Sequence, residues 1–130
     1  MTAAELKYLL AINELYDGTT GIKLTAIAAK MDVTKVSVHR AVERLDKNGY
    51  TERNEKNKVI ISEYGYEQLR LYRTLIHWIS NHLQKKGSIP EEIAMQDAIN
   101  AACSFSDISR TFIAERVICE EQEEKFETKR

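Results

Sequence analysis

The apolar residues in the first quarter of the chain recur with the period of α-helices. Positions three and four apart predict a first helix from about Ala3 to Tyr16, which Asp17-Gly18 ends. A short alanine-rich stretch predicts a second helix from about Leu24 to Met31, with Thr25 as its N-cap. Residues 19–23 between the two helices have no periodic pattern and are expected to form a connector.

A third, strongly amphipathic helix is predicted from Lys35 to Asn48, after a turn at Asp32-Val33 and with Thr34 as its N-cap. Asn48-Gly49 is a typical helix stop, because glycine readily takes the left-handed conformation there. One face of this helix is apolar, with the spacing i, i+3, i+4, i+7, and consists of Val38, Ala41, Val42 and Leu45. The opposite face is polar and partly basic, and consists of Ser37, His39, Arg40, Glu43, Arg44 and Lys47.

After Gly49 the spacing of the apolar residues changes from that of a helix to that of an extended strand. Tyr50 to Arg53 and Val59 to Ser62 predict two short strands, and the polar residues Asn54 to Lys58 predict the turn that joins them. Three helices followed by a two-stranded hairpin predict a winged helix-turn-helix domain over residues 1–65, in which the hairpin is the wing. The fold class is therefore mainly α.

The second half of the chain is predicted to be helical. A long helix is expected from Glu63, capped by Ser62, to Lys86, a second from Pro90 to about Cys103, and a last one capped by Ser106. Residues 66–116 would form a linker and dimerisation region, and the charge-rich residues 117–130 a flexible tail.

The long helix is apolar on more than one side, because Leu75, Ile76 and Ile79 are joined by Trp78. Such a helix is buried on more than one side. This pattern fits either a homodimer interface or a helix inside the protein's own core. A homodimer would place two third helices about one DNA turn apart, where they read a palindrome.

Composition and charge narrow the class of protein. The net charge is −1, and no apolar run approaches the ~18 residues of a membrane span. Two cysteines are too few for a disulfide framework, so a reducing cytoplasm is the expected location. The charge is segregated, with seven basic and four acidic residues in 33–58 but six acidic and four basic residues in 115–130.

This basic segment coincides with the third helix and the wing, which predicts binding to double-stranded DNA. The third helix of such a domain enters the major groove, and its N-terminal residues reach the base edges. We predict base contacts from Ser37, His39 and Arg40. Contacts to phosphates, which position the domain, are predicted from Lys35, Arg44, Lys47, Arg53, Lys56 and Lys58.

Several short motifs in this region form a known pattern, namely Ile27-Ala28, Val36-Ser37-Val38, Val42, Arg44-Leu45, Gly49-Tyr50 and Ser62 to Gly65. With them the chain resembles the diphtheria-toxin-repressor and manganese-transport-regulator family, more weakly beyond the wing but over about residues 5–114. The resemblance implies a homodimeric winged-helix repressor whose long helix is a linker and whose later helices dimerise.

That family is activated by Fe(II) or Mn(II), and here the sequence departs from it. The resemblance places the metal-ligand positions on Lys7, Leu10, Thr74, Ile99, Ala102 and Cys103. A hard cation such as Mn(II) needs carboxylates and imidazoles, which these residues lack. Other candidate ligands are His77, His82 and Asp97 besides Cys103, but the two histidines are five residues apart, a poor spacing for one helix face. No cofactor is therefore assigned, and the effector stays open.

Two other functions compete with DNA-binding regulation. A winged-helix module that binds a protein instead of DNA is favoured by the near-neutral net charge and by Glu43, Asp46, Glu52 and Glu55 beside the basic residues. An enzyme is disfavoured, because the sequence has no nucleophile–base arrangement, phosphate-binding loop or closed metal motif.

Overall fold

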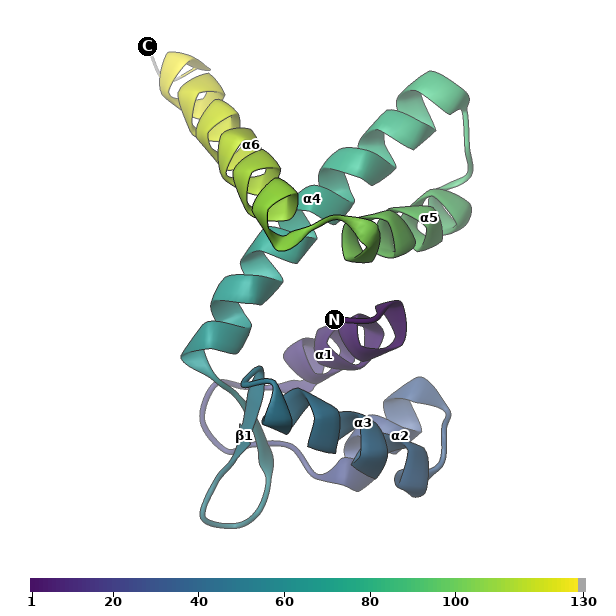
Figure 1. Cartoon of the computed structure of the whole chain (residues 1–130), viewed down its shortest axis with the longest axis vertical. Helices are drawn as coiled ribbons and strands as arrows, with labels where there is room; N and C mark the ends of the chain where they lie inside the picture. Colours follow the sequence, from purple (N-terminus) through teal and green to yellow (C-terminus); the bar gives the residue numbers. More distant parts are fainter. Residues whose placement is uncertain (129–130) are drawn as a thin grey trace. The chain divides into compact units, whose positions relative to one another are not determined.

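The computed structural model describes residues 1–128, which fall into two compact units. The first unit spans Met1–Leu69 and the second begins at Arg70 (Figure 1). The first contains three helices followed by a two-stranded antiparallel hairpin, and the second is helical. The predicted class, a mainly α winged helix-turn-helix domain followed by a helical region, is confirmed.

The first unit begins with α1 (Ala3–Leu15), which is fixed at its start by a capping box. The backbone N–H of Glu5 donates to the Thr2 hydroxyl, and the N–H of Thr2 donates to the Glu5 carboxylate. The helix ends slightly earlier than predicted, at an extended C-cap residue Tyr16, and not at Gly18. The carboxylate of Asp17 then orders the connector by accepting from the backbone N–H groups of Thr19 and Thr20.

The second helix, α2 (Leu24–Met31), begins where it was predicted to begin, but Thr25 is not its N-cap. Lys23 is the N-cap, with no side-chain capping bond, and Thr25 lies inside the first turn. The cause is a backbone pairing that the local pattern does not contain. Ile22 exchanges two 2.8 Å hydrogen bonds with Val59 of the wing, so the extended chain enters the helix directly after that pair.

The turn before α3 (Lys35–Lys47) and the stop after it form as predicted. Asp32 takes the left-handed conformation, with φ of 54°, and the Thr34 hydroxyl accepts from the N–H of Ser37. At the other end Asn48 is the C-cap and Gly49 has φ of 83°.

The wing consists of β1 (Thr51–Arg53) and β2 (Val59–Ile61), which pair antiparallel with Thr51 opposite Ile61. Its turn is organised by Asn54, whose Oδ1 accepts from the N–H groups of Lys56 and Lys58. The Asn54 amide donates to the Thr20 carbonyl at 3.0 Å. The wing is therefore tied to the α1–α2 connector by both backbone and side chain.

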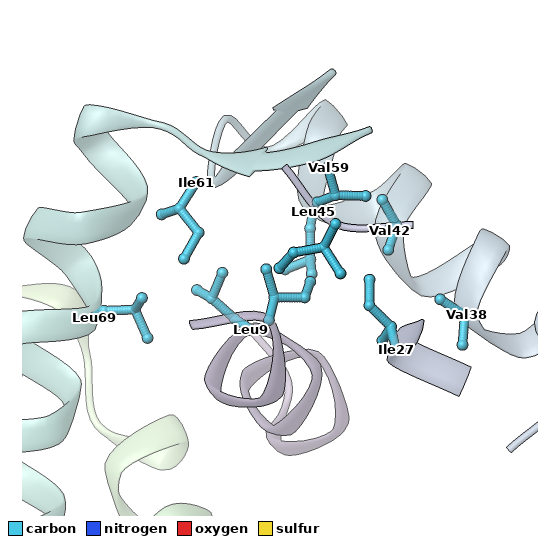
Figure 2. Packing of buried hydrophobic residues seen from close by; sticks show 10 residues of the cluster. Leu9, Ile27, Val38, Val42, Leu45, Val59, Ile61 and Leu69 are labelled. Carbon is cyan, nitrogen blue, oxygen red and sulfur yellow. The ribbon is translucent and has the colours of Figure 1, made fainter. Parts of the chain in front are cut away.

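The core of the first unit lies where the three helices meet the inner face of the wing (Figure 2). The predicted apolar face of α3 is buried there. Burial of each such side chain stabilises the fold by about 1.5–3 kcal/mol before the loss of entropy is counted. The labelled members of this core are Leu9, Ile27, Val38, Val42, Leu45, Val59, Ile61 and Leu69.

The wing leads directly into α4 (Glu63–Gly87), and Ser62 caps this helix as predicted. The Ser62 hydroxyl accepts from the N–H of Gly65 and donates to the Gly49 carbonyl. Gly65 lies so close to Tyr50 that a Cβ atom there would be 2.0 Å from the Tyr50 carbonyl oxygen. Only glycine fits without a shift of backbone.

The second unit holds the rest of α4 together with α5 (Glu91–Ser104) and α6 (Asp107–Thr128). Small residues of α5 and α6, including Ala98 and Ala114, are fully buried in it. Arg110 is only 4% exposed. Its guanidinium lies 4.2 Å from the centre of the Tyr72 ring and donates to the Phe105 carbonyl, which satisfies a cation inside the core.

The predicted charged tail is instead part of α6, which continues to Thr128. Glutamate, glutamine and lysine are good helix formers, and Arg116 pairs with Glu120 one turn later, so the charged sequence sustains the helix. Lys129 and Arg130 lie outside the described residues. No helix of the described part is long and apolar enough to cross a membrane.

Candidate nucleic-acid interface

The exposed face of α3 presents the residues predicted to contact bases. Ser37, His39 and Arg40 are all exposed at the N-terminal part of the helix. Val36, which was not predicted to act, is 62% exposed on the same part of the helix. An apolar side chain there is costly in water, but it suits contact with the C5-methyl group of thymine. Val36 falls outside the buried apolar face of α3. An apolar residue on the otherwise polar face of this helix was the feature of the sequence that could have identified it.

These side chains differ in how far they are already engaged. The Ser37 oxygen accepts from the Thr34 hydroxyl at 2.9 Å, so its own proton remains available. His39 Nδ1 lies 3.8 Å from a carboxylate oxygen of Glu43, an exposed pair that is easily broken. Within the described part of the chain, no acidic side chain pairs with Arg40. Arg40 therefore has the most available donors on this face.

Arg44 and Lys47 continue the exposed face toward the C-terminal end of α3. With Arg40 and Glu43 they line a shallow hollow. The Arg44 Nε atom lies 3.5 Å from the buried carboxylate of Glu5 on α1. This ion pair orients Arg44, which stays more than half exposed and keeps donors for a phosphate.

A second hollow joins three elements of the first unit, and we call it the basic hollow. It has a volume of about 260 Å³ and lies at the starts of α2 and α3 and beside the wing. Its lining contains no acidic residue, and its five basic members are Lys23, Lys35, Arg53, Lys56 and Lys58. Four of the six predicted phosphate contacts thus lie together, in a site suited to an anion.

Lys23 is the member of the basic hollow that sequence reasoning missed. It lies in the connector, far along the chain from the wing, and joins the wing because Ile22 pairs with Val59. It is also the N-cap of α2, where free backbone N–H groups attract anions. The feature of the sequence that could have identified Lys23 as an anion contact is its position directly before the start of a helix.

Arg53 differs from the other basic residues of this hollow. Its Nε atom lies 3.2 Å from Oδ2 of Asp46, and its Nη1 donates to the Asn57 carbonyl. Asp46 also accepts from the buried Thr51 hydroxyl. The carboxylate of Asp46, counted above against DNA binding, is thus compensated inside the domain.

The residues at the family's metal-ligand positions do not fit Fe(II) or Mn(II). Ile99 and Ala102 are buried and have no donor atom, and the half-buried Cys103 supplies only a thiol. Among the described residues there is no group of three or more His, Cys, Asp or Glu side chains that could hold a metal ion. His77 and His82 line a common hollow, but Asp97 and Cys103 are not part of it.

Comparison with known proteins agrees with this fold. Residues 1–59 match the family described as iron dependent repressor, N-terminal DNA binding domain. The chain is 20% identical to the hypothetical protein SSo2273 from Sulfolobus solfataricus, with a TM-score of 0.68 over 90% of this chain and 86% of that one. No curated protein sequence matches.

Two solved regulators share the fold as well. The manganese regulator SloR is 20% identical, with a TM-score of 0.70 over 90% of this chain and 53% of SloR. IdeR of T. acidophilum is also 20% identical, with a TM-score of 0.61 over 91% of this chain and 54% of IdeR. The chain thus spans about half the length of these two proteins, and at this identity the likeness concerns the fold.

Proposed function

Through residues 1–59 this chain belongs to the iron-dependent-repressor family of DNA-binding domains, and from this premise we propose that it binds specific double-stranded DNA as a homodimeric transcriptional repressor. A regulator of this kind acts where the DNA is, so we place it in the cytoplasm. The observation that carries the proposal is the basic hollow beside the N-terminal end of α3.

In this proposal the basic hollow holds the DNA backbone. Lys23, Lys35, Lys56 and Lys58 come from three elements, yet they surround one space of a few hundred Å³ without an acidic neighbour in its lining. Each phosphate that is neutralised releases counterions, so affinity should fall steeply with salt, with a slope of about −0.9 per phosphate contact. These contacts position α3 and carry no sequence information.

Sequence would be read by the exposed N-terminal part of α3. Arg40 has a guanidinium that no described acid engages, and guanine O6 and N7 are its most common bidentate partners. Val36 would lie against a thymine methyl group, with Ser37 and His39 as further polar contacts.

The homodimer is supported by apolar surface on α6. Ile108 and Phe112 lie one turn apart on this helix and are 70% and 69% exposed. Two large neighbouring apolar side chains of this exposure indicate a contact surface. Four residues of α4 suggested an interface from the sequence. Leu75 and Ile76 are buried within the second unit and are not available for it, whereas Ile79 is half-buried and Trp78 is 38% exposed.

Metal activation is not part of this proposal, because the donor atoms at the family's ligand positions do not suit Fe(II) or Mn(II). The chain would have kept the DNA-binding domain of its family and changed the signal to which it responds.

A binding experiment tests the proposed function. DNA would be selected from a random duplex library with the full chain, and its affinity measured by fluorescence anisotropy at several salt concentrations. We expect the double variant Lys56→Ala/Lys58→Ala to bind all duplexes more weakly and with a smaller salt slope. Lys125→Ala on α6 is the matched control and should bind normally. If no duplex is enriched and binding does not depend on salt, the domain is a protein-interaction module instead.

A further inference from the structure

The hollow lined by His77 and His82 is separate from the DNA face and lies within the second unit between α4 and α6, and we call it the aromatic hollow. It has a volume of about 230 Å³. Its α4 residues recur at spacings of three and four, so they form one stripe along the exposed side of that helix. Glu121 of α6 lies on the other side of the hollow.

Trp78 supplies a flat apolar wall to this hollow. Its side chain is 38% exposed, although tryptophan is among the residues with most to gain from burial. The ring of His82 lies 4.7 Å from it, tilted by 58°, and His82 Nδ1 donates to the Trp78 carbonyl at 2.8 Å. The hydrogen bond fixes the imidazole, which in turn helps to hold the indole in place. The exposed part of the Trp78 surface has no protein contact.

The polar groups of the hollow favour an anion at one end. Lys85 and Lys86 provide two ammonium groups, against the single carboxylate of Glu121. Asn81, one turn before Lys85, adds an amide that can donate a hydrogen bond. An apolar wall beside convergent basic groups is the usual make-up of a small-molecule site.

We propose that the aromatic hollow binds a small planar aromatic carboxylate, with its ring on Trp78 and its carboxylate on Lys85 and Lys86. Size argues for a single ring, because the volume is below the roughly 300 Å³ at which pockets for drug-sized ligands begin. An aliphatic acid would use the lysines but not the indole face, and a neutral ring would use only the indole. This proposal concerns the second unit and does not depend on DNA binding by the first.

Trp78 is the chain's single tryptophan, so its fluorescence reports on this hollow directly. Benzoate would be titrated into the full chain, with tryptophan emission and isothermal titration calorimetry as two readouts. We expect benzoate to change the tryptophan emission and to give a calorimetric signal, and the two measurements should yield the same dissociation constant. Cyclohexanecarboxylate has the same charge but no flat face, and it should bind severalfold more weakly.

Variants separate this site from nonspecific binding. Lys85→Met/Lys86→Met should weaken benzoate about tenfold or more, because charge-assisted hydrogen bonds are lost. The matched control Lys125→Met should bind like the unchanged protein. Trp78→Phe keeps a ring and should retain the calorimetric signal, whereas Trp78→Ala should lose most of it. Absence of any benzoate signal, or equal binding by the double lysine variant with its helicity intact, overturns the proposal.

Discussion

Asp46 of α3 and Arg53 of β1 form an ion pair, 3.2 Å from Oδ2 to Nε, that joins α3 to the wing. Both side chains are largely shielded from water, and Asp46 also accepts from the buried Thr51 hydroxyl. The pair therefore helps to hold α3 and the wing, the two elements proposed to contact DNA, against each other.

Breaking that pair should destabilise the first unit. Asp46→Ala leaves the Thr51 hydroxyl and the Arg53 Nε without the carboxylate that accepts from them, and we expect a loss of about 1–3 kcal/mol in the free energy of unfolding. Urea denaturation followed by circular dichroism measures it. The control is Glu43→Ala, whose ion pair with His39 is exposed and should contribute under about 1 kcal/mol. Equal losses for the two variants would contradict the structural role of Asp46.

Arg40 should determine sequence preference more than overall affinity. Arg40→Ala is expected to weaken binding to the selected site by about 1–3 kcal/mol and to leave binding to unrelated duplexes nearly unchanged. Anisotropy with both duplexes, and with Lys58→Ala for comparison, measures the difference. If Arg40→Ala binds its selected site like the unchanged protein, α3 does not read bases through this residue.

Dimerisation should depend on the exposed apolar residues of α6. Phe112→Ser is expected to shift the dimer toward monomer in sedimentation velocity, because a large apolar contact is removed from the interface. Val36→Ser is a matched control, since Val36 is almost as exposed but lies on the proposed DNA face. A chain that stays dimeric after Phe112→Ser has its interface elsewhere.

Stability should depend on Asp17 at low pH. The N–H of Thr19, then the hydroxyl and the N–H of Thr20, donate to this carboxylate and hold the pKa of Asp17 well below its usual range. Because the folded-state pKa is depressed, the stabilisation is present above the unfolded pKa of about 3.9 and is lost as the pH falls below it. Asp17→Asn should therefore be less stable than the unchanged protein near neutral pH, with a difference that shrinks on acidification. The measurement is the urea midpoint of both proteins over a pH series. If Asp17 plays no such part, the midpoints of Asp17→Asn and of the unchanged protein will change with pH in parallel.

The close approach of Gly65 to Tyr50 allows a sharp steric test. Gly65→Ala places a methyl group against the Tyr50 carbonyl oxygen, and we expect a loss of about 1–3 kcal/mol or more from the backbone shift that follows. At Gly87 an added Cβ would meet only the flexible side chain of Ile89 at 3.2 Å, so Gly87→Ala should cost much less. Thermal unfolding of the two variants gives the comparison.

Local pattern was sufficient to predict most of the winged domain. The spacing of Val38, Ala41, Val42 and Leu45 requires a helix with one buried face, and the change of period at Tyr50 requires strands. The exposed positions of Ser37, His39 and Arg40 follow from the same periodicity. Whether these residues contact bases stays a prediction.

The misses arise from contacts between distant parts of the chain. The pairing of Ile22 with Val59 made Lys23, and not Thr25, the N-cap of α2 and brought Lys23 to the wing. Nothing in residues 19–23 encodes a partner more than thirty residues away. The engagement of Arg53 by Asp46 is likewise invisible before the fold is known. The length of α6 was misjudged because charge density was read as disorder, although the residues themselves favour a helix.

The double hydrogen bond between Ile22 and Val59 has a mechanical consequence for the proposed DNA complex. It ties the backbone at the start of α2 to the wing, so the backbone positions from which Lys23 and the wing lysines extend keep a fixed separation. Cationic groups anchored at fixed backbone positions bind best to duplexes whose phosphates already lie at a matching spacing. Other duplexes would have to bend or change groove width, at a cost set by their base sequence. A pairing of two backbone segments would thus let this domain discriminate among DNA sites at base pairs that it does not touch.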